Sequence, residues 1–193
     1  LWKCSSNKKQ SVLFDFKKMK EFGGLVIIWD SLAYSKNYVI SISNNNKTFD
    51  TIYTVKNGSG NKSFIPLKEC EAKYLKLELL KDLSTSSFGI KEIQFLPLEF
   101  SDNANNMFKT IAKQYPYGYF PKYFYDIASY FTVSGVLNDT QEALINEEGQ
   151  VELEKNSFSI IPSLSIDKNL YTWDKVKCTQ TLQANYLPIQ HVL

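Results

Sequence analysis

One stretch near the start of the chain constrains the fold more than any other: residues 27–50, IIWDSLAYSKNYVISISNNNKTFD. From Tyr38 to Ser43, alternate residues fall on opposite sides, which is the period-two pattern of a strand with one face in a core. The triplet Asn44–Asn46 follows, and asparagine tolerates the left-handed backbone of a tight turn. The stretch therefore predicts a strand, a loop, a second strand, a hairpin turn and the start of a third strand.

The rest of the first half repeats this pattern of short strands and turns. Strands are expected at residues 10–16, 25–29, 49–55, 64–67, 75–79 and 90–96. Between them we expect a charged connection at 17–22 closed by Gly23-Gly24, a glycine-rich turn at 57–61 and a polar loop at 82–87. Pro66 favours an edge position, because proline cannot donate to a strand ladder. Strands spaced by about ten residues indicate a β-sandwich.

Composition excludes several classes of protein. The 44% hydrophobic content is ample for packed cores, but no run of about 18 apolar residues predicts a membrane span, and no signal peptide is expected. The net charge is +2, and every basic residue is lysine. Without arginine, the bidentate recognition of phosphate and guanine is lost, which argues against a nucleic-acid binder.

No catalytic machinery is expected in this chain. The one histidine, His191, lies three residues from the end of the sequence, and the common metalloprotease, nucleophile-elbow and phosphate-loop motifs are absent. Glu147 and Glu148 are adjacent at an expected strand end, where successive side chains point to opposite sides. They should therefore not flank a glycosidic bond as a matched pair, and we expect a protein that is not an enzyme over these residues.

The cysteines leave two interpretations open. Cys4, Cys70 and Cys178 are odd in number and have no metal-ligand spacing. A Cys4–Cys70 disulfide and unpaired thiols are both compatible with the sequence, so the cysteines do not define the compartment.

Five segments in the first half share a known order of motifs. They are Trp2-Lys3-Cys4-Ser5-Ser6, Gln10 to Phe16 (QSVLFDF), the Trp29, Ala33 and Tyr38 spacing, Ala72 to Leu77 (AKYLKL) and Phe88 to Ile93 (FGIKEI). In this order they resemble the discoidin-type domain, also called the coagulation factor 5/8 type C domain, a galactose-binding-like group that includes carbohydrate-binding modules. The resemblance implies an all-β fold, a discoidin-like jelly-roll β-sandwich.

The second half is also expected to be mostly β. Residues 99–106 (EFSDNANN) indicate a linker, a short helical spacing follows at 107–111, and the aromatic, proline-containing stretch 114–125 cannot form a regular helix. A strand is expected at 130–133, a hairpin at 143–153 that turns at Glu148-Gly149, and further strands at 158–161, 170–173 and 176–182. The predicted organisation is a sandwich at 1–98, a linker at 99–106 and a β-rich, truncated second domain at 107–193.

This second half resembles the segment that follows a discoidin domain in large glycan-processing proteins of Bacteroidetes. The matching residues are Tyr115 to Pro121 (YPYGYFP), Asn146 to Gly149 (NEEG), Thr172-Trp173 and Tyr186 to Ile189 (YLPI). The resemblance implies the start of a larger β-sandwich ahead of a catalytic domain outside this chain. The aromatic stretch at 115–125 would then either pack against a neighbouring surface or line a site. Trp2, Trp29 and Trp173 are expected in cores.

Sugar binding is the function that the resemblance implies, with a glycan or glycoprotein as partner. Discoidin-type modules bind ligands on loops at one end of the sandwich, where an aromatic face and planar polar groups meet the sugar. The loop residues with that chemistry are Asp30, Tyr34, Asn37, Asn57, Asn61 and Phe88. The His-Arg-Asn set of galactose-binding members is absent, because residues 1–98 contain neither arginine nor histidine. Glu92 matches a family calcium position, but the loop that completes that site is missing, so neither metal nor cofactor is expected.

Two alternatives to a sugar-binding module remain open. The first domain would be a spacer that binds no ligand and braces the adjacent β domain through the aromatic stretch. The second alternative is an adhesive, protein-binding domain, in which the triplets that begin at Asn46, Asn57, Asn61 and Asn138 would be glycosylation sites. The module interpretation implies a secreted, periplasmic or cell-surface location.

Overall fold

The computed structural model describes residues 1–6, 8–80, 87–155 and 157–193. The chain forms two compact units, Leu1–Met107 and Phe108–Leu193, which are described separately. Antiparallel sheets dominate both units, so the prediction of an all-β fold is confirmed.

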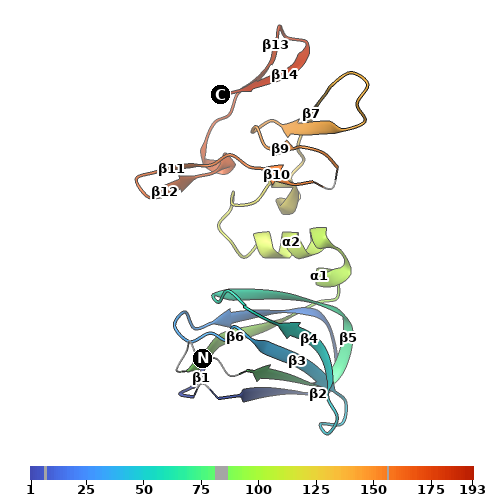
Figure 1. Ribbon diagram of the computed structural model, residues 1–193, viewed down its shortest axis with the longest axis vertical. Helices are drawn as coiled ribbons and strands as arrows, with labels where there is room; N and C mark the ends of the chain where they lie inside the picture. Colours follow the sequence, from blue (N-terminus) through green and yellow to red (C-terminus); the bar gives the residue numbers. More distant parts are fainter. Residues whose placement is uncertain (7, 81–86, 156) are drawn as a thin grey trace. The chain divides into compact units, whose positions relative to one another are not determined.

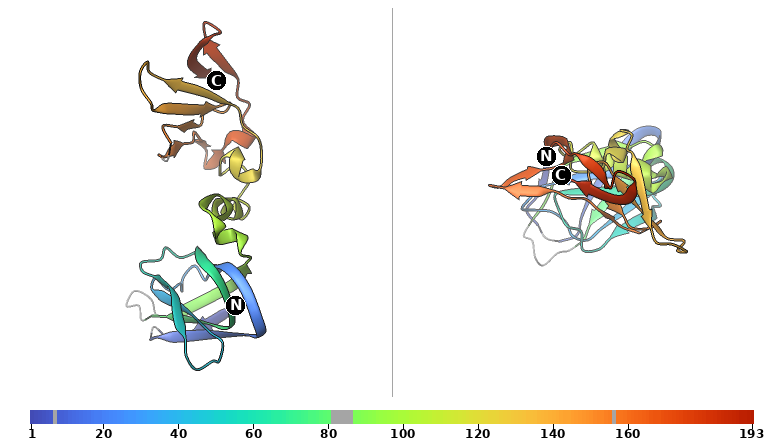
Figure 2. Two further views of the ribbon diagram at one scale, coloured as in Figure 1. Left: turned by 90° about the vertical axis from the view of Figure 1, so that its right-hand side faces the viewer. Right: turned by 90° about the horizontal axis from the view of Figure 1, so that it is seen from above.

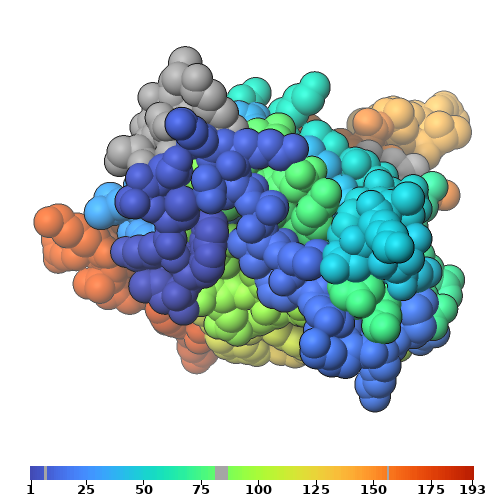
Figure 3. All heavy atoms as spheres, turned by 90° about the horizontal axis from the view of Figure 1, so that it is seen from below, coloured from blue at the N-terminus to red at the C-terminus, as the bar shows by residue number. Residues whose placement is uncertain are grey.

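The first unit contains one six-stranded sheet in the order β1-β6-β2-β5-β3-β4. Its strands are β1 (Trp2–Cys4), β2 (Gln10–Trp29), β3 (Tyr38–Ser43), β4 (Asp50–Val55), β5 (Lys62–Leu79) and β6 (Phe88–Leu96). The sheet folds over itself into a sandwich because its two longest strands continue from one layer into the other (Figure 1 and Figure 2). In Figure 3, the dark blue N-terminal residues lie against the green of β6, with which β1 pairs.

The length of β2 and β5 differs from the prediction. The expected connection at 17–22 and the expected gap between 64–67 and 75–79 both lie inside continuous strands. Pairing continues across the bend, where Lys20 is opposite Ala72 and Phe22 is opposite Cys70. The register shifts between Asp15 and Lys20, and Lys17 has a φ of 65°. A bulge therefore accommodates the charged residues without ending the strand.

The position of Pro66 agrees with the sequence analysis. Pro66 lies opposite Gly24 of β2, whereas β3 pairs only with the later part of β5, from Tyr74 to Leu79. The early part of β5 is thus paired on one side only. On the unpaired side, proline's lack of a backbone N–H removes no hydrogen bond of the sheet.

The core lies between the two layers and is apolar and aromatic. Trp29 and Tyr38 are each 1% exposed, and their rings lie 5.2 Å apart. Both come from the stretch that predicted the fold, and Trp2 packs against the same core from β1. The other buried members include Phe22, Leu25, Ile27, Ile40, Ile65, Leu67, Leu75, Leu77, Leu79, Phe88 and Ile90.

The expected linker at 99–106 is largely helical instead. It forms α1 (Glu99–Asp102) and the start of α2 (Ala104–Ala112), which contains the helical spacing at 107–111. Phe100 of α1 is 2% exposed, and its ring occupies the space that a side chain at Gly24 would need. The missing side chain at Gly24 therefore lets α1 pack against the sandwich, so residues 99–102 belong to the first unit.

The described residues of the second unit begin with the last part of α2 and continue as short strands and 3-10 turns. Its elements are η1 (Lys122–Tyr125), β7 (Phe131–Gly135), β8 (Glu142–Asn146), β9 (Val151–Glu152), β10 (Ser159–Ile160), β11 (Leu164–Ile166), β12 (Asn169–Tyr171), η2 (Trp173–Lys175), β13 (Gln180–Gln183) and β14 (Leu187–Val192). They form a four-stranded sheet, β10-β9-β8-β7, and two hairpins. The hairpin expected at 143–153 is confirmed, with Gly149 in its turn at a φ of 74°.

One detail of the second unit differs from the prediction, and the aromatic stretch has contacts of its own. Trp173 lies in η2 rather than in a strand, and it is only half-buried. The aromatic stretch packs on itself, because the Tyr117 ring contacts both Tyr125 and Trp173 at 4.8 and 5.2 Å between centroids. As expected, this stretch contains no regular α-helix, only the short η1.

The structure also bears on the predictions for the cysteines and for membrane spans. Cys4, Cys70 and Cys178 are all free, which favours the interpretation as unpaired thiols. Burial raises the pKa of the Cys70 thiol. In the part of the chain that the structure describes, no helix is long and apolar enough to cross a membrane.

The facing strands β2 and β5 provide a matched test of the core. Leu77→Ala should lower the free energy of unfolding by about 2–5 kcal/mol, because Leu77 is fully buried and the change leaves a cavity. Leu13→Ala, at a site 47% exposed on the paired strand, should cost much less. Denaturant unfolding of both variants tests this, and equal losses would contradict the described core.

Candidate ligand-binding site

Strand register brings several loops to one end of the first unit. Tyr38 is opposite both Leu79 and Val55, so β3 begins where β4 and β5 end. The connection 30–37 leaves β2 at this end, and the connection 56–61 runs from β4 to the start of β5. We call these two connections the loop end. They hold five of the six candidate residues.

Backbone hydrogen bonds join the two connections of the loop end. Gly58 N donates to Lys36 O at 2.8 Å, and Trp29 N donates to Asn61 O at 2.8 Å. Asp30 N donates to Gly89 O at 2.9 Å, which ties the first connection to β6 as well. The loop backbone is thus preorganised by the sandwich beneath it.

Asp30 is bound to other residues of the protein and stabilises its loop. Its carboxylate lies 2.8 Å from Lys3 Nζ and accepts a hydrogen bond from Leu32 N at 3.1 Å. The hydrogen bond from Lys3 holds the pKa of this carboxyl below its usual range. Because the side chain is largely buried and already paired, it orients the loop and offers little to a ligand.

Tyr34 contributes an aromatic ring that is held from one side. The side chain is half-buried, packs against the core, and lies over Gly60. A Cβ at Gly60 would lie 2.9 Å from the ring, and Gly60 has a φ of 78°. The glycine therefore serves both the turn and the close contact with the ring.

The asparagines divide into one that braces the loops and two that face solvent. Asn37 Oδ1 accepts a hydrogen bond from Asn57 N at 3.2 Å, which joins the two connections. Asn57 and Asn61 are exposed and have left-handed backbones, with φ of 58° and 55°. Within the described ranges, their side-chain amides make no hydrogen bond with the protein. These two amides remain available to a ligand.

The prediction that Phe88 offers a loop aromatic is wrong. Phe88 belongs to β6, is 0% exposed and packs in the core of the sandwich. Its strand pairing with Cys4 of β1 extends the sheet beyond the expected start at residue 90. The polar loop expected at 82–87 lies almost entirely outside the described residues.

Two further residues belong to this end, and neither has a strong signal in the sequence. Leu32 is 89% exposed at the surface of the first connection, whereas the next residue, Ala33, is buried. Lys3 pairs with Asp30 across 27 positions of sequence, and no local pattern indicates such a contact. A leucine in a segment expected to be a loop was the only signal that the sequence offered.

Three carboxylates were considered for metal binding or catalysis: Glu92, Glu147 and Glu148. Glu92 is exposed and accepts a hydrogen bond from Gln94 Nε2 at 2.9 Å. Among the described residues, no cluster of histidine, cysteine or carboxylate side chains could hold a metal ion. The expectation that Glu147 and Glu148 point to opposite sides is wrong, because both pair with Lys122. They lie in the turn of the hairpin, where strand alternation does not apply.

The contact between Gly60 and Tyr34 yields a test with a matched control. Gly60→Ala should destabilise the first unit by roughly 1–2 kcal/mol, because alanine is strained at positive φ and would also displace the ring. Gly58→Ala should be close to neutral, since its new Cβ would lie no closer than 3.4 Å to a neighbour. Thermal unfolding compares the two, and a Gly58 variant as unstable as the Gly60 variant would contradict the assignment.

The Asp30–Lys3 pair predicts a pH dependence of stability. A carboxyl whose folded pKa is depressed stabilises the fold above its ordinary pKa of about 3.9, and this contribution is lost as pH falls through the lower folded pKa. Asp30→Asn should therefore lower the melting temperature at pH 7. The deficit should shrink between about pH 4 and pH 2. Asp50→Asn, at an exposed aspartate, is the control, and a deficit that persists at low pH would argue against the pair.

The first unit is similar to domains of known proteins. Residues 1–93 match the family model described as F5/8 type C domain. Chitosan-binding module 1 of a Paenibacillus sp. IK-5 chitosanase/glucanase is 19% identical, with a TM-score of 0.45 over 49% of this chain and 74% of that chain. The family 32 carbohydrate-binding module of Streptococcus pneumoniae EndoD is 14% identical, with a TM-score of 0.44 over 50% and 74%.

A third solved structure extends the set of similar modules. It is a module from Clostridium perfringens in complex with GalNAc-β-1,3-galactose, 18% identical, with a TM-score of 0.40 over 46% of this chain and 66% of that chain. The search of curated proteins found no match. Over residues 1–93, the chain belongs to the F5/8 type C domain family.

Proposed function

We propose that the first unit is a non-catalytic carbohydrate-binding module that holds a sugar on its loop end. The observation that carries the proposal is the combination of exposed Leu32 and half-buried Tyr34 with the unpaired amides of Asn57 and Asn61. A sugar ring presents an apolar C–H face and hydroxyl groups that both donate and accept hydrogen bonds. The aromatic and apolar side chains can contact the C–H face, and the amides can form hydrogen bonds with the hydroxyl groups.

Preorganisation of the loops supports this function. The hydrogen bonds from Gly58, Trp29 and Asp30 fix the backbone before any ligand arrives. Binding then costs less conformational entropy than it would on mobile loops. Membership of residues 1–93 in the F5/8 type C family, which includes sugar-binding modules, supports the same assignment.

The sugar class differs from that of the galactose-binding members. Their His-Arg-Asn set cannot be built here, because the chain has no arginine and its only histidine is His191. The available groups are neutral amides, which recognise hydroxyls or acetamido groups. We therefore propose a neutral glycan as the ligand of the loop end.

The wider setting is part of the proposal. The segments 115–121 and 146–149 resemble those behind discoidin domains in large glycan-processing proteins. We infer that this module is an accessory part of such a protein, located at the cell surface, in the periplasm or outside the cell. Its catalytic groups would lie in another domain. Fractionation of the producing cells tests the location, and a cytoplasmic pool alone would contradict it.

Sugar binding is tested by a glycan-array screen of the whole chain, with hits measured by calorimetry. Tyr34→Ala should weaken a hit about tenfold or more, through loss of the aromatic contact. Asn61→Gly removes an amide without straining the left-handed backbone, and it should weaken binding by up to about tenfold. Asn46→Gly is the matched control, because Asn46 is exposed with a φ of 58° but lies in the hairpin between β3 and β4.

The outcomes separate the module from its alternative. Loss of binding in the Asn61 variant but not in the Asn46 variant would support the loop end as the site. If no glycan on the array binds, with or without calcium, the first unit is a spacer that supports the neighbouring β domain. Equal effects of both asparagine variants would place the ligand elsewhere on the unit.

A further inference from the structure

The second unit contains a pocket that none of the functions considered so far uses. Its volume is about 420 Å³, and a largely apolar wall surrounds a few polar groups. The lining includes the polar or charged residues Glu148, Gln150, Thr172 and Lys177 and the aromatic residues Tyr171 and Trp173. This combination of an apolar cavity with few polar groups is typical of small-ligand sites.

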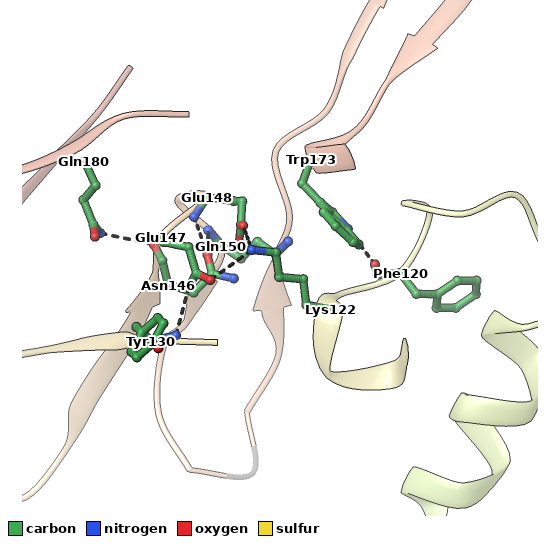
Figure 4. A network of polar contacts seen from close by, with 9 residues as sticks. All are labelled: Phe120, Lys122, Tyr130, Asn146, Glu147, Glu148, Gln150, Trp173 and Gln180. Atoms are coloured by element: carbon green, nitrogen blue, oxygen red, sulfur yellow. Dashed lines mark hydrogen bonds and ion pairs between the residues drawn. The ribbon is translucent and has the colours of Figure 1, made fainter. Parts of the chain in front are cut away.

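The hairpin turn between β8 and β9 fixes the polar wall. Asn146 Oδ1 accepts hydrogen bonds from Glu148 N at 3.1 Å and from Gln150 N at 2.9 Å (Figure 4). Gly149 N donates to Asn146 O at 3.1 Å, which closes the turn. The backbone of both lining residues is therefore held by the buried side chain of Asn146.

Two polar atoms in this wall lack partners. Glu148 Oε2 and Gln150 Nε2 are buried and, among the described residues, make no hydrogen bond. Their side chains are only 9% and 7% exposed. Lys122 pairs with the other carboxylate oxygen of Glu148, so the charge is compensated while one acceptor stays open (Figure 4). Buried polar groups are normally hydrogen-bonded, so an unpaired acceptor and an unpaired donor on two residues that line one pocket require an explanation.

The opposite wall is aromatic and rigid. The Trp173 indole N–H donates to Phe120 O at 2.8 Å (Figure 4). Tyr117 packs edge-on against the same indole, and Lys122 Nζ lies 5.6 Å from its ring centre. Tyr171, 36% exposed, adds a second ring to the lining. The indole thus has a fixed orientation before a ligand enters.

We infer that this pocket binds one ring of a neutral sugar. Ligand hydroxyls would donate to Glu148 Oε2 and accept from Gln150 Nε2, and the C–H face of the ring would pack on the aromatic wall. Hydroxyl is the group that satisfies both open atoms, because it donates and accepts at once. Glu148 is paired with Lys122 and Lys177 also lines the pocket, so the wall carries both signs of charge, which fits a neutral ligand. The volume suits a single ring. This site is separate from the loop end and does not depend on the function proposed for it.

Cys178 provides a local readout of occupancy. It lines the pocket, whereas Cys70 is buried in the first unit and Cys4 belongs to β1. In a Cys4→Ser background, the rate of labelling by an aromatic disulfide reagent reports on Cys178. Methyl glycosides of glucose, galactose, mannose and N-acetylglucosamine are the probes, and at least one should slow labelling in a saturable way.

Two carboxylate variants test the assigned contact. Glu148→Gln should weaken the protecting glycoside roughly tenfold, the loss expected for a hydrogen bond to a charged group. Glu147→Gln is the matched control, because Glu147 also pairs with Lys122 but does not line the pocket. Near-ultraviolet circular dichroism confirms that each variant keeps its packing.

The results decide the inference in either direction. Protection that survives in Tyr34→Ala and Glu147→Gln but weakens in Glu148→Gln supports a sugar site in the second unit. Protection lost in Tyr34→Ala would assign the effect to the loop end and overturn the inference. Unchanged labelling with every glycoside would also overturn it, and would leave ordered water as the partner of the open atoms.

Discussion

The pairing of β2 with β5 is the constraint on which the first unit depends. Both strands pass from one layer of the sandwich to the other, so a single antiparallel ladder sets the register of both layers. Leu77 and Ile27 contribute to the same core from opposite layers because of this ladder. A shift of one residue would turn every apolar side chain of a layer toward solvent, so the core and the ladder specify each other.

The sequence predicted most of this arrangement, but not the continuity of the long strands. Alternation around Tyr38 and the glycine-rich turn at 57–61 are local signals, and both elements appear where expected. Residues 17–22 have no alternation, and their place in β2 depends on partners about 50 residues away, such as Ala72. Local pattern cannot report such pairing. The same holds for 99–106, where the absence of a side chain at Gly24 lets a helix pack.

The candidate site was predicted in part, for the same reason. Tyr34, Asn37, Asn57 and Asn61 were proposed for their chemistry in loops, and register alone brought them to one end. Phe88 was misplaced because its strand begins two residues earlier than its alternation indicates, through pairing with β1. Asp30 proved to be paired with Lys3, a long-range contact with no sequence signal. Residue type thus predicts what a side chain can do, whereas tertiary pairing decides whether it is free to do it.

The two units bury different kinds of side chain. The first unit buries a large apolar and aromatic core, as expected for a domain stabilised by removal of apolar surface from water, together with a few polar side chains such as Asp30 and Ser41. In the second, the buried side chains include Asn146, Glu148, Gln150 and Thr172, while Phe131 and Ile160 are about half exposed. Buried polar groups add little net stability, and those without partners reduce it. Asn146 and Thr172 are satisfied within the protein, by the backbone of the hairpin turn and by Asp174. Packing therefore accounts for them, whereas the unpaired atoms of Glu148 and Gln150 are the ones for which the inferred ligand would account.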